Sequence, residues 1–172
     1  GVLVFLQAIL NGDNIISLRG LSSSSIKRVL EEFMPNYIAG TPSFYKLNFT
    51  KSDKFESIDG LSIGGERSED TLIEMLRVVF PKAKINNIYA TSEFGSLLVS
   101  DGEYFRISRS FNDKVRVINN ELQVHHSLVS KSIVSDGIWY NTGDMVEVFE
   151  DSEGLKLKLV ARLSTTFNVG GL

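Results

Sequence analysis

The pattern of apolar residues changes near residue 90 of this 172-residue chain. Before Asn87, apolar positions recur with the spacing of helices or of continuous buried strands, whereas after Ser96 they mostly alternate with polar ones. The stretch between them, NIYATSEFGS, breaks from an apolar run into small and polar residues. A strand that ends in a polar loop carrying one acid is a usual ligand site in an α/β sheet. A plain exit from strand to turn is the alternative interpretation.

The first half is predicted to alternate strands and helices. The predicted strands cover residues 15–18, 37–39, 61–63 and 85–89, and the helices cover residues 26–34, 43–48 and 69–79. Ser22–Ser25 supplies the N-cap of the first of these helices, and Ser68 that of the last. Residues 2–10 are apolar throughout, and their period does not distinguish a short buried helix from a buried strand. This order predicts a mostly parallel sheet with helices packed on it.

The second half is predicted to be antiparallel. Short strands are expected at residues 97–99, 104–107, 115–118, 121–124, 145–149 and 155–160, and Asn119-Asn120 is a reasonable hairpin turn. The fold class is therefore α/β, with a mostly parallel sheet and packed helices followed by a small antiparallel β-barrel or curled sheet. We expect two subdomains, an α/β unit at residues 1–96 and an antiparallel β unit at residues 97–172.

Composition limits the function classes. The net charge of −3 and the lack of clustered Lys and Arg argue against nucleic-acid binding. There is no cysteine, which excludes disulfides and thiolate metal sites and is consistent with a cytoplasmic location. The apolar opening, about ten residues long, is too short for a membrane span. Because the chain begins without Met inside an apolar element, we expect a piece of a longer protein.

Two polar groups favour structural roles. His125 and His126 are adjacent, so in a strand they point to opposite faces and do not readily share a metal. Ser22–Ser25 followed by Lys27 lacks the glycine that a phosphate loop needs. We therefore expect surface or packing roles for the histidines and a cap for the serines.

Three further groups suit a ligand, although each also has a plain structural interpretation. Gly64-Gly65-Glu66 follows a strand, and two glycines allow a flat ligand to lie against the backbone or simply form a tight turn. Asp144, at the end of WYNTGD, is an acceptor for sugar hydroxyls or a turn-fixing residue. Arg162 suits a phosphate or ribose, or pairs with a surface acid.

The order of these pieces is more specific than any one of them. GGE, YATSE, WYNTGD and ARLSTTFNVGG, in that sequence, resemble the adenylate-forming superfamily of acyl-CoA synthetases, peptide-synthetase adenylation domains and luciferase. The family pattern is a Gly-rich turn, Tyr-Gly-x-Thr-Glu, Trp-Tyr-x-Thr-Gly-Asp and Gly-Arg-x-Asp before a hinge. GTPSFYKLNF at residues 40–49 is similar to the segment ahead of the Gly-rich turn, so the resemblance covers nearly the whole chain.

The resemblance implies a role for each matching residue. Gly64, Gly65 and Glu66 would lie beside an adenine on which Tyr89 stacks, and Ala90 would border the acyl pocket. Ser92 would donate a hydrogen bond to a phosphate oxygen, and Glu93 would bind magnesium. Asp144 would bind the ribose hydroxyls, with Arg162 assisting.

The reaction implied by the resemblance uses ATP, Mg²⁺ and a small-molecule carboxylate. The carboxylate attacks the α-phosphate, which gives an acyl-adenylate and pyrophosphate, and a thiol such as coenzyme A then takes the acyl group. Ser92 and Glu93 are the catalytic candidates in this chain.

The chain departs from the family pattern at four positions. Ala90 replaces Gly, Ser92 replaces Thr, the hinge Asp is Ser164, and a basic residue often found later is Asn168. The family's phosphate loop is expected upstream of Gly1, and the lid with its catalytic Lys beyond Leu172. We therefore expect a central piece of an enzyme that is inactive alone. The alternatives are a non-catalytic nucleotide-binding or protein-interaction module, and a generic α/β domain whose motifs do not converge.

Overall fold

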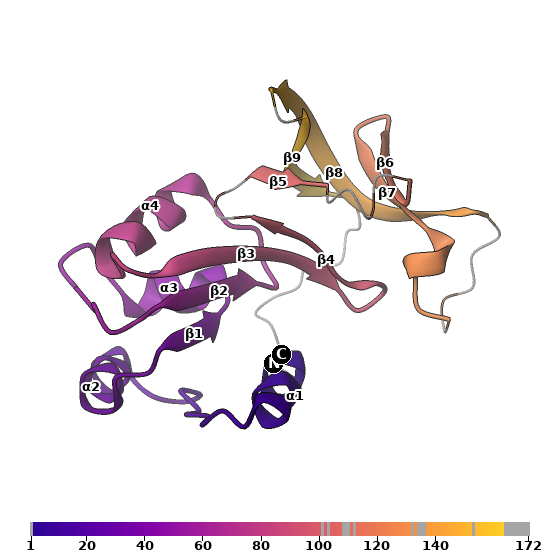
Figure 1. The fold of residues 1–172 in the computed structure, drawn as a ribbon. Helices are drawn as coiled ribbons and strands as arrows, with labels where there is room; N and C mark the ends of the chain where they lie inside the picture. The colour runs from indigo at the N-terminus through magenta and orange to yellow at the C-terminus, as the bar shows by residue number, and fades with distance from the viewer. Residues whose placement is uncertain are drawn as a thin grey trace.

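The computed structural model describes residues 2–100, 102, 104–107, 111, 113–131, 133, 137–152 and 154–163. Two sheets and the helices packed beside the first of them make up this part of the chain (Figure 1). The elements are, in order, α1 Val2–Asn11, α2 Ser23–Phe33, β1 Tyr37–Gly40, α3 Pro42–Asn48, β2 Gly60–Gly64, α4 Asp70–Val79, β3 Lys84–Thr91, β4 Gly95–Ser100, β5 Tyr104–Arg106, β6 Val115–Ile118, β7 Glu121–His125, η2 His126–Leu128, β8 Trp139–Asp151 and β9 Gly154–Arg162.

The first sheet has the strand order β1-β2-β3-β4. The pairs β1–β2 and β2–β3 are parallel, and β4 returns antiparallel to β3. Helices connect the parallel strands, because a parallel pair needs a crossover connection and cannot be joined by a tight hairpin. The prediction of a mostly parallel sheet with packed helices is confirmed.

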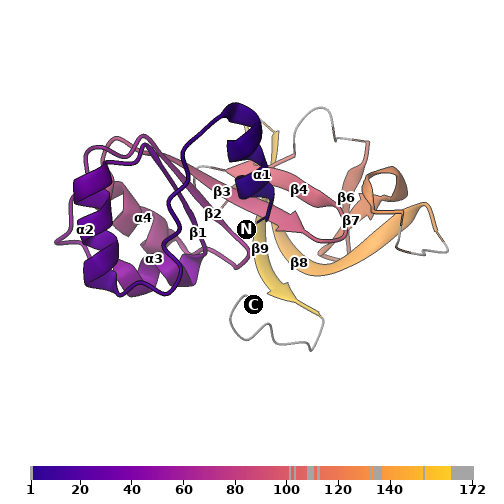
Figure 2. The same ribbon diagram turned by 90° about the horizontal axis from the view of Figure 1, so that it is seen from below.

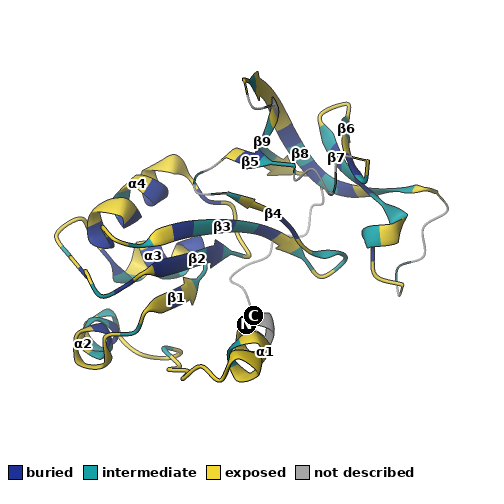
Figure 3. Cartoon of the chain, viewed as in Figure 1, coloured by how far each residue is buried: buried dark blue, intermediate teal, exposed yellow. Residues whose placement is uncertain are grey.

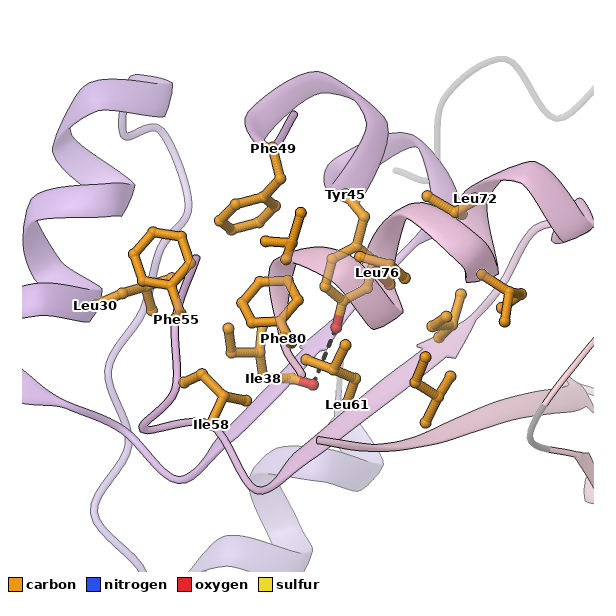
Figure 4. Packing of buried hydrophobic residues seen from close by; sticks show 14 of the residues in the cluster. Leu30, Ile38, Tyr45, Phe49, Phe55, Ile58, Leu61, Leu72, Leu76 and Phe80 are labelled. Carbon is orange, nitrogen blue, oxygen red and sulfur yellow. Dashed lines mark hydrogen bonds between the residues drawn. The ribbon is translucent and has the colours of Figure 1, made fainter. Parts of the chain in front are cut away.

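Helices α2, α3 and α4 cover this sheet and enclose its core (Figure 2). Their apolar stripes meet the inward side chains of the strands, and an aromatic cluster fills the space between them. Figure 4 shows Phe49, Phe55 and Phe80 in this cluster, where Phe55 and Phe80 stack with ring centroids 5.6 Å apart. Tyr45 is fully buried there, and its hydroxyl donates to the backbone carbonyls of Ile38 and Ser62, each at 3.0 Å.

Local sequence explains most helix ends. Ser22 caps α2 by accepting a hydrogen bond from the Ser25 amide, and Met34 adopts a left-handed conformation just before Pro35. The predicted cap at Ser68 is wrong, because α4 begins at Asp70 and Glu69 occupies the N-cap without a side-chain hydrogen bond. Ser68 is instead buried, and its hydroxyl donates to Asn87 of β3. A buried tertiary partner replaces the local cap because an unpaired hydroxyl there would be costly.

The start of the chain differs from prediction in two ways. Residues 2–11 form a helix, but no side chain described at positions 4–11 is buried: Phe5 is 54% exposed and Leu10 is 86% exposed (Figure 3). The predicted strand at residues 15–18 is absent from the described sheets, and Ile15 and Ile16 are exposed. A strand requires a neighbouring strand for its backbone hydrogen bonds, and this segment has none. Only Leu18 packs against the core.

The second sheet has the order β5-β9-β8-β7-β6, and every pair in it is antiparallel. No pairing joins β5 to β6 among the described residues, so the sheet is curled and open rather than a closed barrel. Asn119 and Asn120 have φ values of 50° and 63°, which confirms the predicted hairpin turn. Strand β8 is longer than predicted and includes WYNTGD, which the sequence suggested as a turn.

A second core joins the two sheets. Tyr89, Leu97 and Leu98 from the first sheet pack with Phe105 and Leu122 from the second, and other buried residues complete the cluster. The end of β3 is therefore fixed against the second sheet. No helix in the described part of the chain combines the length and apolar character that a membrane crossing requires.

Replacing Tyr45 with Phe should destabilise the protein by about 1–3 kcal/mol, because the buried Ile38 carbonyl and the partly buried Ser62 carbonyl lose the one donor that they share. The matched control is Tyr37→Phe. Tyr37 is half exposed and its hydroxyl bonds the side chain of Ser62, so its loss should cost less than about 0.5 kcal/mol. Urea unfolding of the two variants measures the difference, and equal losses would contradict the assignment.

Candidate functional site

Tyr89 lies where β3 leaves the first core. Burial alternates along the strand, so Ile85, Asn87 and Tyr89 point inward. The Tyr89 ring contacts Phe94 and Phe105 of the second core, with centroid distances of 5.8 and 6.4 Å. The register with β4 shifts between Tyr89 and Ala90, where Leu97 of β4 is an extra residue opposite them. Such irregularities turn a strand and redirect its side chains.

Asp144 lies at a second irregularity, in the pairing of β7 with β8. Glu121 pairs with Met145 but Gln123 pairs with Asn141, so β8 carries extra residues over this interval. Gly143 adopts φ +73°, a left-handed conformation that other residues rarely take. The Thr142 hydroxyl donates to the Leu122 carbonyl and accepts from the Asp144 amide, at 2.8 and 3.0 Å. These bonds hold Asp144 inward, with 8% of the residue exposed.

Tyr89 and Asp144 meet across the two sheets. The Tyr89 hydroxyl donates to Asp144 Oδ2 at 2.5 Å. Burial raises the pKa of the Tyr89 hydroxyl, and the neighbouring Asp144 carboxylate raises it further. The phenol therefore stays protonated at neutral pH and remains a donor to this carboxylate.

Arg162 lies between two carboxylates. It is the register partner of Asp144, and its Nε is 3.7 Å from Asp144 Oδ1. One terminal guanidinium nitrogen is 4.0 Å from Glu93 Oε1. The Leu163 amide donates to the Gly143 carbonyl at 2.6 Å and fixes this end of β9 to β8. Arg162 thus connects the acid on β8 with the acid on the turn after β3.

Glu93 is held in the turn between β3 and β4. Its backbone carbonyl accepts from the Ser130 amide at 2.6 Å, and its carboxylate accepts from the Ser92 hydroxyl at 3.1 Å. Partial burial by itself would raise the pKa of the Glu93 carboxyl. Hydrogen bonds from Thr91, Ser92 and its own amide, together with the charge of Arg162, outweigh burial and lower that pKa. Glu93 is therefore ionised at neutral pH.

A cavity of about 380 Å³ lies between the β2–α4 turn, β3, β5, β8 and β9. That volume is within the usual range for small-molecule sites. Six of the nine residues that the sequence suggested line it, namely Gly65, Glu66, Tyr89, Ala90, Asp144 and Arg162. Gly64, Ser92 and Glu93 are not among the lining residues. Glu93 is joined to the cavity wall through Arg162.

The two glycines of the β2–α4 turn have separate structural reasons. A Cβ on Gly64 would lie 3.3 Å from the Ile88 carbonyl oxygen, and Gly65 has φ +82°. Glu66 does not extend freely into the cavity, because its Oε2 accepts from the Ser43 amide at 3.1 Å and from the Ser43 hydroxyl at 2.5 Å. The turn is thus fastened to the start of α3.

Sequence reasoning assigned no ligand role to the other residues of the cavity wall, which include the polar residues Arg67, Ser68, Asn87 and Lys158. Asn87 is 3% exposed, accepts from the Ser68 hydroxyl at 3.2 Å and donates to the Gly102 carbonyl at 2.8 Å. A polar residue at an inward position of a strand was the signal for Asn87. No sequence signal marked Arg67 or Lys158. The hinge positions Ser164 and Asn168 lie outside the described residues.

The two adjacent histidines, His125 and His126, belong to different elements. His125 is the last residue of β7, and its ring packs edge-on against Trp139 with centroids 5.4 Å apart. His126 begins η2. No three His, Cys, Asp or Glu side chains gather as a metal site within the ranges that the structure describes.

Searches by sequence matched no family model and no curated protein. The fold does match solved structures. A luciferase-like enzyme from the nonluminescent Zophobas morio mealworm has a TM-score of 0.68 at 16% identity, over 97% of this chain and 47% of that one. The N-terminal domain of FACL13 from Mycobacterium tuberculosis also has a TM-score of 0.68 at 16% identity, over 94% and 47%.

A third match is O-succinylbenzoate coenzyme A synthetase (MenE) from Bacillus subtilis in complex with ATP and magnesium ion. Its TM-score is 0.65 at 17% identity, over 100% of this chain and 41% of that one. The chain therefore spans less than half the length of each of these structures. The chain has the fold that these luciferase-like and coenzyme A synthetase structures share over the matched region, which is the fold implied by its resemblance to the adenylate-forming superfamily.

Proposed function

We propose that this chain is the central part of an ATP-dependent ligase of the adenylate-forming superfamily, and that the cavity between its sheets receives the nucleotide. One observation supports this above the others. Tyr89, Asp144 and Arg162, which come from three separate motifs, converge on one cavity, with Glu93 joined to them by Arg162. A generic α/β domain with coincidental motifs would have no reason to bring these side chains together.

The proposed binding roles follow the chemistry of each group. The glycine turn at Gly64 and Gly65 offers a backbone surface to a flat base, and Tyr89 contributes an aromatic edge to the same cavity. Asp144 keeps one carboxylate oxygen, Oδ1, that does not accept from Tyr89 and suits ribose hydroxyls. Arg162 adds a positive charge beside them.

Magnesium suits the Glu93 side of the site. Glu93 is ionised, one quarter of its side chain is exposed, and Ser92 donates to it. One carboxylate with phosphate oxygens and waters is a usual set of ligands for this ion. When bound, magnesium would neutralise phosphate charge. MenE, with ATP and magnesium ion present in its structure, has the same fold over the matched region.

In the proposed reaction, a carboxylate oxygen attacks the α-phosphorus of ATP and the bond to the bridging oxygen breaks, which releases pyrophosphate. Asp144 and Arg162 hold the ribose so that the α-phosphate is fixed relative to the attacking carboxylate, and the Ser92 hydroxyl turns from Glu93 to donate to a phosphate oxygen. Alignment and charge neutralisation supply most of the rate enhancement in such a step. We further propose that a thiol, such as that of coenzyme A, takes the acyl group, and that Ala90 narrows the acyl pocket by one methyl group.

Replacing Asp144 with Ala or Asn in the full-length protein should weaken AMP binding about tenfold to a hundredfold, because a ribose hydroxyl loses a charged acceptor. Calorimetry measures the affinity, with Asp59→Ala, an exposed acid outside the cavity, as the control. The Asn variant keeps the side-chain shape and one acceptor oxygen for the Tyr89 hydroxyl, so it separates the loss of charge from the loss of that hydrogen bond. A wild-type protein without AMP affinity would favour a non-catalytic module.

The stabilising effect of the Glu93 charge should depend on pH. Its folded-state pKa is lowered, so the ionised form contributes stability above the unfolded value of 4.5 and that contribution is lost as the pH falls below it. The unfolding free energies of the wild type and Glu93→Gln should therefore differ more at pH 7 than at pH 3. Glu31→Gln, on the exposed surface of α2, is the control. An equal difference at both pH values would contradict the lowered pKa.

The 172 residues alone should not catalyse exchange of pyrophosphate into ATP, because the proposed phosphate loop and lid belong to other parts of the longer protein. In the full-length enzyme, Glu93→Ala should reduce exchange about a hundredfold, which is typical for the loss of one transition-state charge contact. Radiolabelled pyrophosphate exchange measures both. Exchange by the isolated chain above its own Glu93→Ala variant would refute the proposal that it is incomplete.

A further inference from the structure

A side-chain hydrogen bond joins the β2–α4 turn to the second sheet. A terminal nitrogen of Arg67 donates to the backbone carbonyl of Val160 in β9 at 2.7 Å. These residues are far apart in sequence and belong to different sheets. Arg67 also lines the cavity.

The acceptor carbonyl is made accessible by an irregularity in β9. Met145 pairs with Ala161 and Val146 pairs with Leu159, so Val160 is the extra residue of a bulge between β8 and β9. The register with β5 ends at Lys158 and does not include Val160 either. A bulged residue lies outside the regular ladder, so its carbonyl suits a side-chain donor from elsewhere. Its neighbours Leu159 and Ala161 both line the cavity.

The other side of the turn is fixed as well. Gly64 packs closely on the Ile88 carbonyl, and the Glu66 carboxylate accepts from the amide and hydroxyl of Ser43. Arg67 therefore adds a direct connection between this turn and β9. These two walls face each other across the proposed nucleotide cavity.

We propose that Arg67 is a positioning residue, which holds the glycine turn against the bulge at Val160 and thereby fixes the width of the cavity for a flat base. The inference rests on the proposed function, because the cavity is taken to receive a purine nucleotide. Arg67 acts through the turn and β9, and it is not assigned a contact with the ligand. An arginine suits the task because its guanidinium presents several N–H donors in a rigid plane.

The test compares Arg67→Met, which keeps the aliphatic stem without the donors, with Arg67→Lys, which retains a cationic donor. Arg28→Met, an exposed arginine on α2 that does not line the cavity, is the matched control. Two measurements on the full-length protein are needed: AMP affinity by calorimetry, and hydrogen exchange of the amides at residues 65–68 and 159–162 without nucleotide.

Arg67→Met should weaken AMP binding about threefold to tenfold, as expected for one exposed charged hydrogen bond, and should speed exchange in both segments. Arg67→Lys should recover most of both properties, and Arg28→Met should change neither. Unchanged affinity in Arg67→Met would overturn the positioning role, whether or not exchange is faster. Weaker binding without faster exchange would indicate direct ligand contact and would overturn it too. A wild type that does not bind AMP would instead refute the proposed function, before any variant is compared.

Discussion

The hydrogen bond between Tyr89 and Asp144 is the interaction on which the candidate site depends. It joins the end of a strand in the first sheet to a bulge in the second, and both residues are almost completely buried. A buried carboxylate is costly without donors. The phenol and the nearby Arg162 guanidinium provide that compensation, so the two sheets are held in the arrangement that forms the cavity.

Three strand irregularities surround the cavity. They occur at Leu97 in β4, opposite Tyr89 and Ala90 of β3, between Asn141 and Met145 in β8, and at Val160 in β9. A regular ladder would direct alternate side chains to fixed faces and would use each backbone group in pairing. Bulges free these strands from that pattern, so one directs Asp144 inward and another leaves a carbonyl for Arg67. The site is therefore built where the sheets are least regular.

Fold prediction succeeded where no tertiary contact overrode the local pattern of apolar residues. The presence of α4, the parallel strands and the Asn119-Asn120 hairpin follow from local pattern and turn chemistry. It failed at residues 15–18, where an apolar run has no neighbouring strand, and at Ser68, where a buried partner replaced a helix cap. In the site, Tyr89, Asp144 and Arg162 were marked by their motifs. Arg67 had no motif, because its partner is a backbone carbonyl in a distant strand.

The sequence by itself determined the order of the elements, the change from a helix-covered parallel sheet to an antiparallel one, and the identity of the acids and the arginine that suit a nucleotide. Those features depend on the period of apolar residues and on chemistry within a few positions along the chain. Only the tertiary structure decided which of the suggested residues share a cavity. It also decided that the Glu66 carboxylate accepts a hydrogen bond from α3 and that Arg67 donates one to β9. Such contacts join segments far apart in sequence, and local patterns do not encode the packing distances and bulges that bring them together.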